Sequence, residues 1–160
     1  MWQVKRLAAV IELILKYHPK GLRVLVGDIE PTTAELDEIL RCVEGNELPL
    51  RVAAAFPSSP QERGVMRAET IIAIVGEGGG WSGVAAMARE FRNLYRETWE
   101  IFRVHVEWID SSGSRIEQDS ALRRMAVRFG ISEDTIQRKR RFVIEKIAAA
   151  AVRTDRVLTA

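Results

Sequence analysis

The sequence predicts a mainly α-helical protein of one domain, or of one small domain with a helical appendage, and three observations support this fold class. Apolar residues near the N-terminus follow helical spacing, and a three-four repeat of apolar residues continues from Val84 to Ile109. The C-terminal third carries start and stop signals for two consecutive helices. One or two short strands could form between residues 22 and 56. The overall composition, 47% hydrophobic and 29% charged, is that of a folded globular chain.

The N-terminal part is predicted to contain two helices, and the segment between them is compatible with a short strand. The first helix covers residues 2–17, and the second runs from about Thr33 to Val43. Residues 22–26 (Leu-Arg-Val-Leu-Val) could form a short strand. Cys42 falls on the predicted buried side of the second helix and is expected to be a structural thiol. A Pro-Ser-Ser-Pro loop at 57–60 marks the first domain boundary.

The middle of the chain is predicted to be helical on both sides of a glycine run. Residues 61–75 suggest a helix, although 70–75 alone would also suit a buried strand, and Gly76 to Gly80 interrupt the pattern. The following stripe, 84–109, predicts a long amphipathic helix broken at most once. Such a stripe is usually core, and the same spacing also occurs in dimer seams. His105 lies in this stripe and is expected to be a core histidine. The resulting division is 1–60, 61–110 (with dimerisation as one role), 111–153 and a tail at 154–160.

Several function classes are excluded by what the sequence lacks. The N-terminal apolar stretch is interrupted by Glu12, so no run reaches the length of about 18 residues that suggests a membrane span, and no signal-peptide h-region is present. Cys42 is the only cysteine, which excludes disulfide frameworks and CxxC metal sites. We expect a cytoplasmic protein that is not an enzyme, with no membrane partner, no metal site and no cofactor.

Positive charge is concentrated at the C-terminal end. Residues 1–114 carry a net charge of −3, whereas residues 115–153 carry +5. An overall charge of +2 conceals this asymmetry, which is typical of chains that bind nucleic acid with one region.

The same basic region has the spacing of a helix-turn-helix, with helices at Ser120–Phe129 and from Ser132 to about Ala150. Ala126 is small where the helices cross, Gly130 supplies a left-handed turn, and Ile136 fills the angle between the helices. Ser132 suits the N-cap position of the second helix. The remaining wedge residues are Met125, Phe129 and Ile131.

One face of the second helix is predicted to contact DNA. On a helical wheel, Ile136, Val143 and Ile147 share a face, and a polar face lies roughly opposite. Arg138 and Arg141 suit guanine edges, and Gln137 suits an adenine edge. The residues expected to contact phosphates are Arg128, Ser132, Lys139 and Arg140.

This segment resembles the region-4 type helix-turn-helix of sigma factors and of small phage-encoded transcription regulators of the ArpU/RinA kind. The matching residues are Met125-Ala126, Phe129-Gly-Ile-Ser132, Thr135-Ile136, Arg138-Lys-Arg140 and Ile144-Glu-Lys-Ile-Ala148. The resemblance covers about forty residues and implies promoter binding by the C-terminal module. It favours a sequence-specific transcriptional regulator of phage or prophage type that binds double-stranded DNA. A second copy of the chain and RNA polymerase both stay open as partners of the N-terminal part.

Two alternatives stay open. Gly78-Gly-Gly80-Trp-Ser-Gly83, within the glycine-rich loop 76–83, has GxGxxG spacing and could cradle a nucleotide if it followed a strand and preceded a helix. A flexible turn between helices is the plainer interpretation of these glycines. The basic C-terminal helices could also serve a protein-binding helical adaptor, with their charge simply facing solvent.

Overall fold

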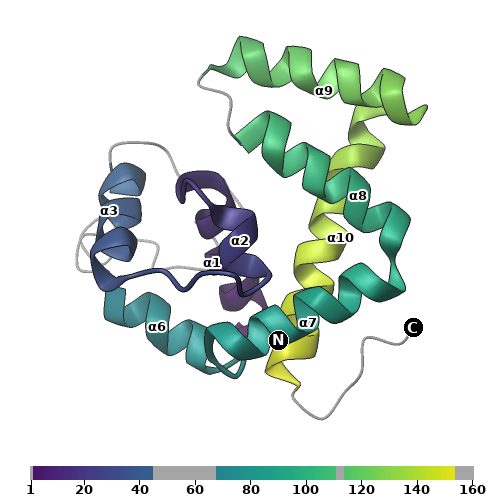
Figure 1. Cartoon of the computed structure of the whole chain (residues 1–160). Coiled ribbons are helices and arrows are strands. Elements are labelled where there is room, and N and C mark those ends of the chain that lie inside the picture. The colour runs from purple at the N-terminus through teal and green to yellow at the C-terminus, as the bar shows by residue number, and fades with distance from the viewer. Residues whose placement is uncertain (1, 45–67, 111–113, 154–160) are drawn as a thin grey trace.

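The computed structural model describes residues 2–44, 68–110 and 114–153, and all regular structure within them is helical, which confirms the mainly α fold (Figure 1). The elements are α1 (Trp2–Tyr17), α2 (Gly21–Leu25), α3 (Thr33–Glu44), α6 (Ala68–Gly76), α7 (Gly80–Leu94), α8 (Arg96–His105), the π-helical turn η1 (Val106–Asp110), α9 (Arg115–Phe129) and α10 (Glu133–Val152). The predicted loop at 57–60 and the tail at 154–160 lie outside the described residues.

Residues 22–26 do not form the short strand considered for them, because Leu22 to Leu25 belong to the short helix α2 and Val26 is its C-cap. Val24 N–H donates to the carbonyl of Lys20, and Val26 N–H donates to that of Leu22. Gly21 lets α2 start directly against α1, since a Cβ there would lie 2.7 Å from the carbonyl oxygen of Ile14. The buried side chains of this segment thus reach the core from a helix, and tertiary packing overrides the β preference of its valines.

Helix α1 lies at the centre of the fold and contacts α2, α3, α6, α10 and η1. This position explains why eight of its sixteen residues are buried, on more than one face. Most of the buried apolar residues that the structure describes form one cluster around α1, which draws side chains from every described helix except α9; we call it the body cluster.

Cys42 is exposed, contrary to the expectation of a buried thiol. The buried residues of α3 are Leu36, Ile39 and Leu40. Cys42 follows Leu40 by two residues, which turns it by about 200° around the helix and away from that face.

The glycine run forms a tight corner between α6 and α7. Gly79 and Gly80 have φ values of 83° and 76°, in the left-handed region. A Cβ at Gly78 would lie 2.7 Å from Leu7 Cδ2, so this glycine allows the corner to pack on α1. The segment before the loop is helix α6, so the strand required by the dinucleotide-binding fingerprint is absent from this described position, and 70–75 is not a buried strand.

The predicted stripe 84–109 forms α7, α8 and η1, with a break at Tyr95 between α7 and α8. Its apolar residues Val84, Ala88, Phe91 and Phe102 are 2% exposed or less and belong to the body cluster. These four residues are therefore core of their own chain, whereas Leu94 of the same stripe is 50% exposed.

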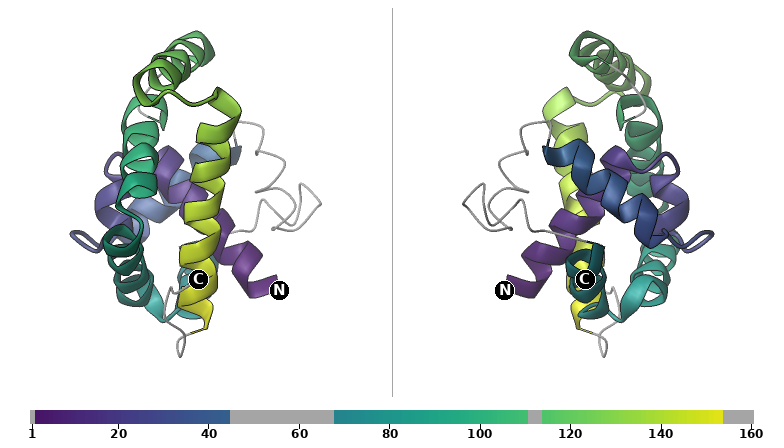
Figure 2. Two further views of the ribbon diagram at one scale, coloured as in Figure 1. Left: turned by 90° about the vertical axis from the view of Figure 1, so that its right-hand side faces the viewer. Right: turned by 90° about the vertical axis from the view of Figure 1, so that its left-hand side faces the viewer.

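Helix α10 is long enough to take part in two separate cores. Its C-terminal half supplies Val143, Ile144 and Ile147 to the body cluster. Its N-terminal half supplies Ile136 to a second cluster with Val104, Leu122 and Met125, which we call the head cluster. We define the head as α9 together with residues 133–142 of α10. The head projects at the end of the molecule opposite α6 and α7 (Figure 2).

No single helix among the described residues is long and apolar enough to cross a membrane, although α6 and α7 taken together pass the same test of length and composition with a bend of 56°.

Candidate nucleic-acid interface

The turn between α9 and α10 has the geometry that the sequence pattern requires. Gly130 ends α9 in the left-handed conformation, with φ of 65° and ψ of 32°. Ile131 N–H donates to the carbonyl oxygen of Ala126 at 3.2 Å, and Ser132 Oγ accepts from Thr135 N–H at 3.1 Å. These bonds satisfy backbone groups that both helix ends would otherwise leave unpaired. The chain thus turns from α9 into α10 within three residues, and α9 lies across the end of α10 (Figure 1).

The first helix of the pair is longer than expected, because it begins at Arg115 rather than Ser120. Ser114 caps it, and its Oγ accepts from Glu117 N–H at 3.1 Å. A serine three residues before a glutamate is a known start signal that the prediction overlooked.

Apolar packing fixes the angle between the two helices. Met125 and Ile136 are fully buried, and Leu122 is nearly so. Val104 of α8 completes this head cluster, while Ala126, Phe129 and Ile131 pack on it from partly exposed positions. The predicted turn residues therefore come together as a three-helix unit of α8, α9 and α10.

The residues predicted to contact base edges all lie on the surface of the head. Gln137, Arg138 and Arg141 are exposed along one side of α10 near its N-terminus. Arg138 forms an ion pair with Asp134, with Nη2 2.6 Å from Oδ2, and both side chains are about 70% exposed. An ion pair this exposed is worth little in water, so Arg138 can change partner at small cost.

Three of the four predicted phosphate contacts are also accessible. Arg128 and Ser132 are exposed, and Lys139 is half-buried. Ser132 Oγ already serves as the cap of α10 and lies 2.8 Å from Thr135 Oγ1.

Two neighbours of Arg128 were missed by sequence reasoning. The guanidinium carbons of Arg124 and Arg128 lie 5.8 and 5.5 Å from the ring centre of Trp108 on η1. This cation–π arrangement holds two arginines, one helical turn apart, beside one indole. Their i, i+4 spacing was visible in the sequence, but the position of Trp108 depends on the tertiary fold.

Arg140 is not a surface residue, so its assignment as a phosphate contact is wrong. Its side chain is only 10% exposed and is held by carboxylates from two other elements. Nη2 lies 2.9 Å from Glu12 Oε2, and Nη1 lies 3.0 Å from both carboxylate oxygens of Asp110. Nη1 is also 3.0 Å from Nδ1 of His105. Arg140 follows Ile136 by four residues, which places it on the buried face of α10.

Burial changes the protonation equilibria of this cluster, which we call the Arg140 cluster (Glu12, His105, Asp110 and Arg140). Burial raises the pKa of Asp110 to about 6, and the nearby charge of Arg140 opposes this increase. Burial, together with the charge of Arg140, lowers the pKa of His105 to about 3. His105 is therefore a neutral core histidine at physiological pH.

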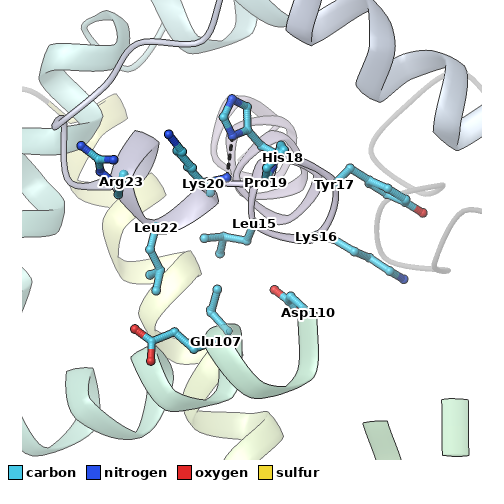
Figure 3. A pocket seen from close by; sticks show the side chains of 12 residues that line it. Leu15, Lys16, Tyr17, His18, Pro19, Lys20, Leu22, Arg23, Glu107 and Asp110 are labelled. Atoms are coloured by element: carbon cyan, nitrogen blue, oxygen red, sulfur yellow. Dashed lines mark hydrogen bonds between the residues drawn. The ribbon is translucent and has the colours of Figure 1, made fainter. Parts of the chain in front are cut away.

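A pocket of about 480 Å³ lies beside the Arg140 cluster, between the end of α1 and η1 (Figure 3). Leu15 and Leu22 line one wall, and Glu107 and Asp110 come from the other. The backbone there is held by His18, whose Nδ1 accepts from Lys20 N–H at 2.9 Å. A second pocket of about 350 Å³ reaches Arg140 itself. Both pockets share Asp110 as a wall residue.

The accessible charge of the C-terminal region remains positive once Arg140 is set aside. Nine other Lys and Arg residues and five Asp and Glu residues occur in 115–153, which leaves a net charge of +4.

Comparison of this chain with protein-family models, with curated proteins and with solved structures found no match.

Proposed function

We propose that this chain is a sequence-specific transcriptional regulator of phage or prophage type that binds double-stranded DNA through α9 and α10. One observation carries the proposal. A left-handed turn at Gly130 and a serine cap at Ser132 join two packed helices, and the second helix exposes Gln137, Arg138 and Arg141 near its start. A helix presented in this way fits the major groove, which is about 12 Å wide.

Each exposed side chain has a defined role in this proposal. Arg138 and Arg141 donate paired hydrogen bonds to guanine, and Gln137 pairs with adenine. Arg128 and Lys139 neutralise backbone phosphates and set the register of the head on the duplex. Arg124 joins this set, because it shares the Trp108 ring with Arg128.

The partner of the N-terminal part is a second copy of the chain or RNA polymerase. Two copies would place two heads on two half-sites, which raises affinity without new contacts. A polymerase contact would instead recruit the enzyme to a site that one head selects. Measuring the number of chains per DNA molecule separates these two arrangements.

Binding to duplex DNA tests the proposal. A pool of random duplexes is enriched on the full chain, and the selected duplex is then titrated by fluorescence anisotropy at several salt concentrations. We expect a negative slope of log affinity against log salt, because phosphate contacts release counterions. The Arg138→Ala/Arg141→Ala variant should lose at least about tenfold in affinity for the selected duplex.

A matched control removes the same charge elsewhere. Arg41 and Arg92 are exposed on α3 and α7, and the Arg41→Ala/Arg92→Ala variant should bind the selected duplex as the unmodified chain does. Equal losses in both variants, or binding that does not depend on salt, would contradict the proposal.

A further inference from the structure

Helix α10 connects the head to the rest of the chain without a linker. Its C-terminal half is packed in the body cluster, and Ile136 in its N-terminal half is packed in the head cluster. Arg140 lies at the boundary, four residues after Ile136 and three before Val143. A change in the orientation of α10 relative to α1 would therefore move the exposed face of α10 that carries Arg138 and Arg141.

Arg140 is the residue at this boundary with directional contacts to three other elements. Its Nε and Nη2 reach Glu12 of α1, at 3.4 and 2.9 Å. Its Nη1 faces both oxygens of Asp110 on η1 and Nδ1 of His105 on α8. One planar guanidinium thus joins α1, α8, η1 and α10, and η1 leads into the segment before α9.

Apolar contacts alone would define this junction less sharply. Hydrophobic attraction is non-directional, whereas a guanidinium fork donates hydrogen bonds to carboxylates only in fixed directions. Replacing a buried ionic cluster by neutral groups often leaves stability unchanged or raises it, so a role in orientation can be separated from a role in stability. Binding sites need their groups held to within about 0.5 Å and 10–20°.

We infer that Arg140 is a positioning residue: by holding Glu12 and Asp110 together, it fixes the orientation of the head relative to α1 and so sets DNA affinity without touching DNA. The second part of this inference rests on the proposed function. The first part, the fixed orientation, stands independently of DNA and can be measured without it.

The decisive variant neutralises the whole cluster with residues of similar size, Glu12→Gln/Asp110→Asn/Arg140→Met. Spin labels are placed at Lys5→Cys on α1 and Ser120→Cys on α9, both exposed positions, in a Cys42→Ser background. The parent should give one narrow distribution of distances between the labels. The triple variant should give a broader distribution at unchanged helix content by circular dichroism.

The control variant is Ile147→Val, which weakens the body cluster on the same helix and leaves the Arg140 cluster intact. It should keep the narrow distribution even though its unfolding midpoint falls. In anisotropy titrations of the selected duplex, the triple variant should bind about tenfold more weakly with an unchanged salt slope, and Ile147→Val should bind normally.

The outcomes are distinguishable. A narrow distribution in the triple variant, or equal broadening in Ile147→Val, would overturn the positioning role. Broadening in the triple variant together with no DNA binding by the parent would support the fixed orientation and refute the proposed function. If the triple variant does not fold, Arg140→Lys replaces it, because an ammonium keeps the charge but cannot reach both carboxylates as a fork. Broadening is then expected, and an unchanged distribution would refute the inference.

Discussion

The Arg140 cluster should make two protonation effects on stability oppose each other, and single substitutions should reveal each one. The pKa of His105 is lowered to about 3 in the folded chain, from 6.5 in an unfolded one. The unfolded chain therefore takes up this proton first as the pH falls. The contribution of His105 to the free energy of unfolding is complete above pH 6.5 and is lost as the pH falls from 6.5 towards 3.

Asp110 acts in the opposite direction. Its pKa is raised to about 6 in the folded chain, from 3.8 in an unfolded one. The folded chain now takes up the proton first, so the contribution of Asp110 is largest below pH 3.8 and is lost as the pH rises through 6. The charged groups that face this carboxyl are Arg140, Glu12 and Lys16.

The magnitude follows from proton linkage. One proton bound in only one of the two states changes the free energy of unfolding by about 1.4 kcal/mol per pH unit. Both residues titrate in this way between about pH 4 and pH 6, with opposite signs. In the unmodified chain the two effects therefore largely cancel over this window.

Substitution removes the cancellation. Relative to the unmodified chain, Asp110→Asn should lose roughly 1 kcal/mol of unfolding free energy for each unit by which the pH falls from 6 to 4. His105→Gln, which keeps an acceptor for Arg140, should gain about the same amount over the same interval. Urea unfolding followed by circular dichroism at pH 4, 5, 6 and 7 measures both differences. A difference from the unmodified chain that stays constant with pH in either variant would refute the assigned protonation states.

Three further predictions concern the turn, each checked by urea unfolding and by anisotropy on the selected duplex. Gly130→Ala should cost about 1–2 kcal/mol, because alanine is strained at a φ of 65°; an unchanged midpoint would show that the turn is not held in this conformation. Ser132→Ala should cost about 1 kcal/mol by removing the cap of α10, whereas Ser132→Asp should keep stability and weaken DNA binding by repelling phosphate. Ile136→Ala should cost about 2–5 kcal/mol through the cavity it leaves in the head cluster, and a smaller loss would mean that the head repacks.

The sequence was sufficient for the features that depend on local spacing. The ends of α1, the left-handed Gly130 and the cap at Ser132 follow from neighbouring residues, and the structure places each as expected. The short helix α2 (Gly21–Leu25) was missed because valine and leucine suit a strand as well as a buried helix. What decided between them was the packing of Gly21 on α1.

Arg140 shows where local spacing stops being informative. A wheel of α10 places it beside Ile136 and Val143, yet an arginine at that position can either extend past the core to solvent or enter it. Its partner Glu12 is 128 residues away in the sequence. Glu12 itself was noticed only because it interrupts an apolar stretch. A charge within an apolar stripe is thus a signal that a partner exists, and a second such charge elsewhere in the chain is a candidate for it.

The glycine corner between α6 and α7 shows that a sequence motif, too, depends on its tertiary surroundings. GxGxxG spacing indicates that another group lies close to the glycine backbone. In a dinucleotide-binding fold that group is a pyrophosphate. Here the approaching group is the chain itself: Leu7 and Ala151 would lie 2.7 and 3.2 Å from a Cβ at Gly78, and Gly83 packs on the carbonyl of Gly78. A glycine motif therefore indicates a close approach to the backbone without identifying the group that approaches. The preceding element, a strand in the dinucleotide-binding fold and a helix here, indicates whether that group is a ligand or the chain itself.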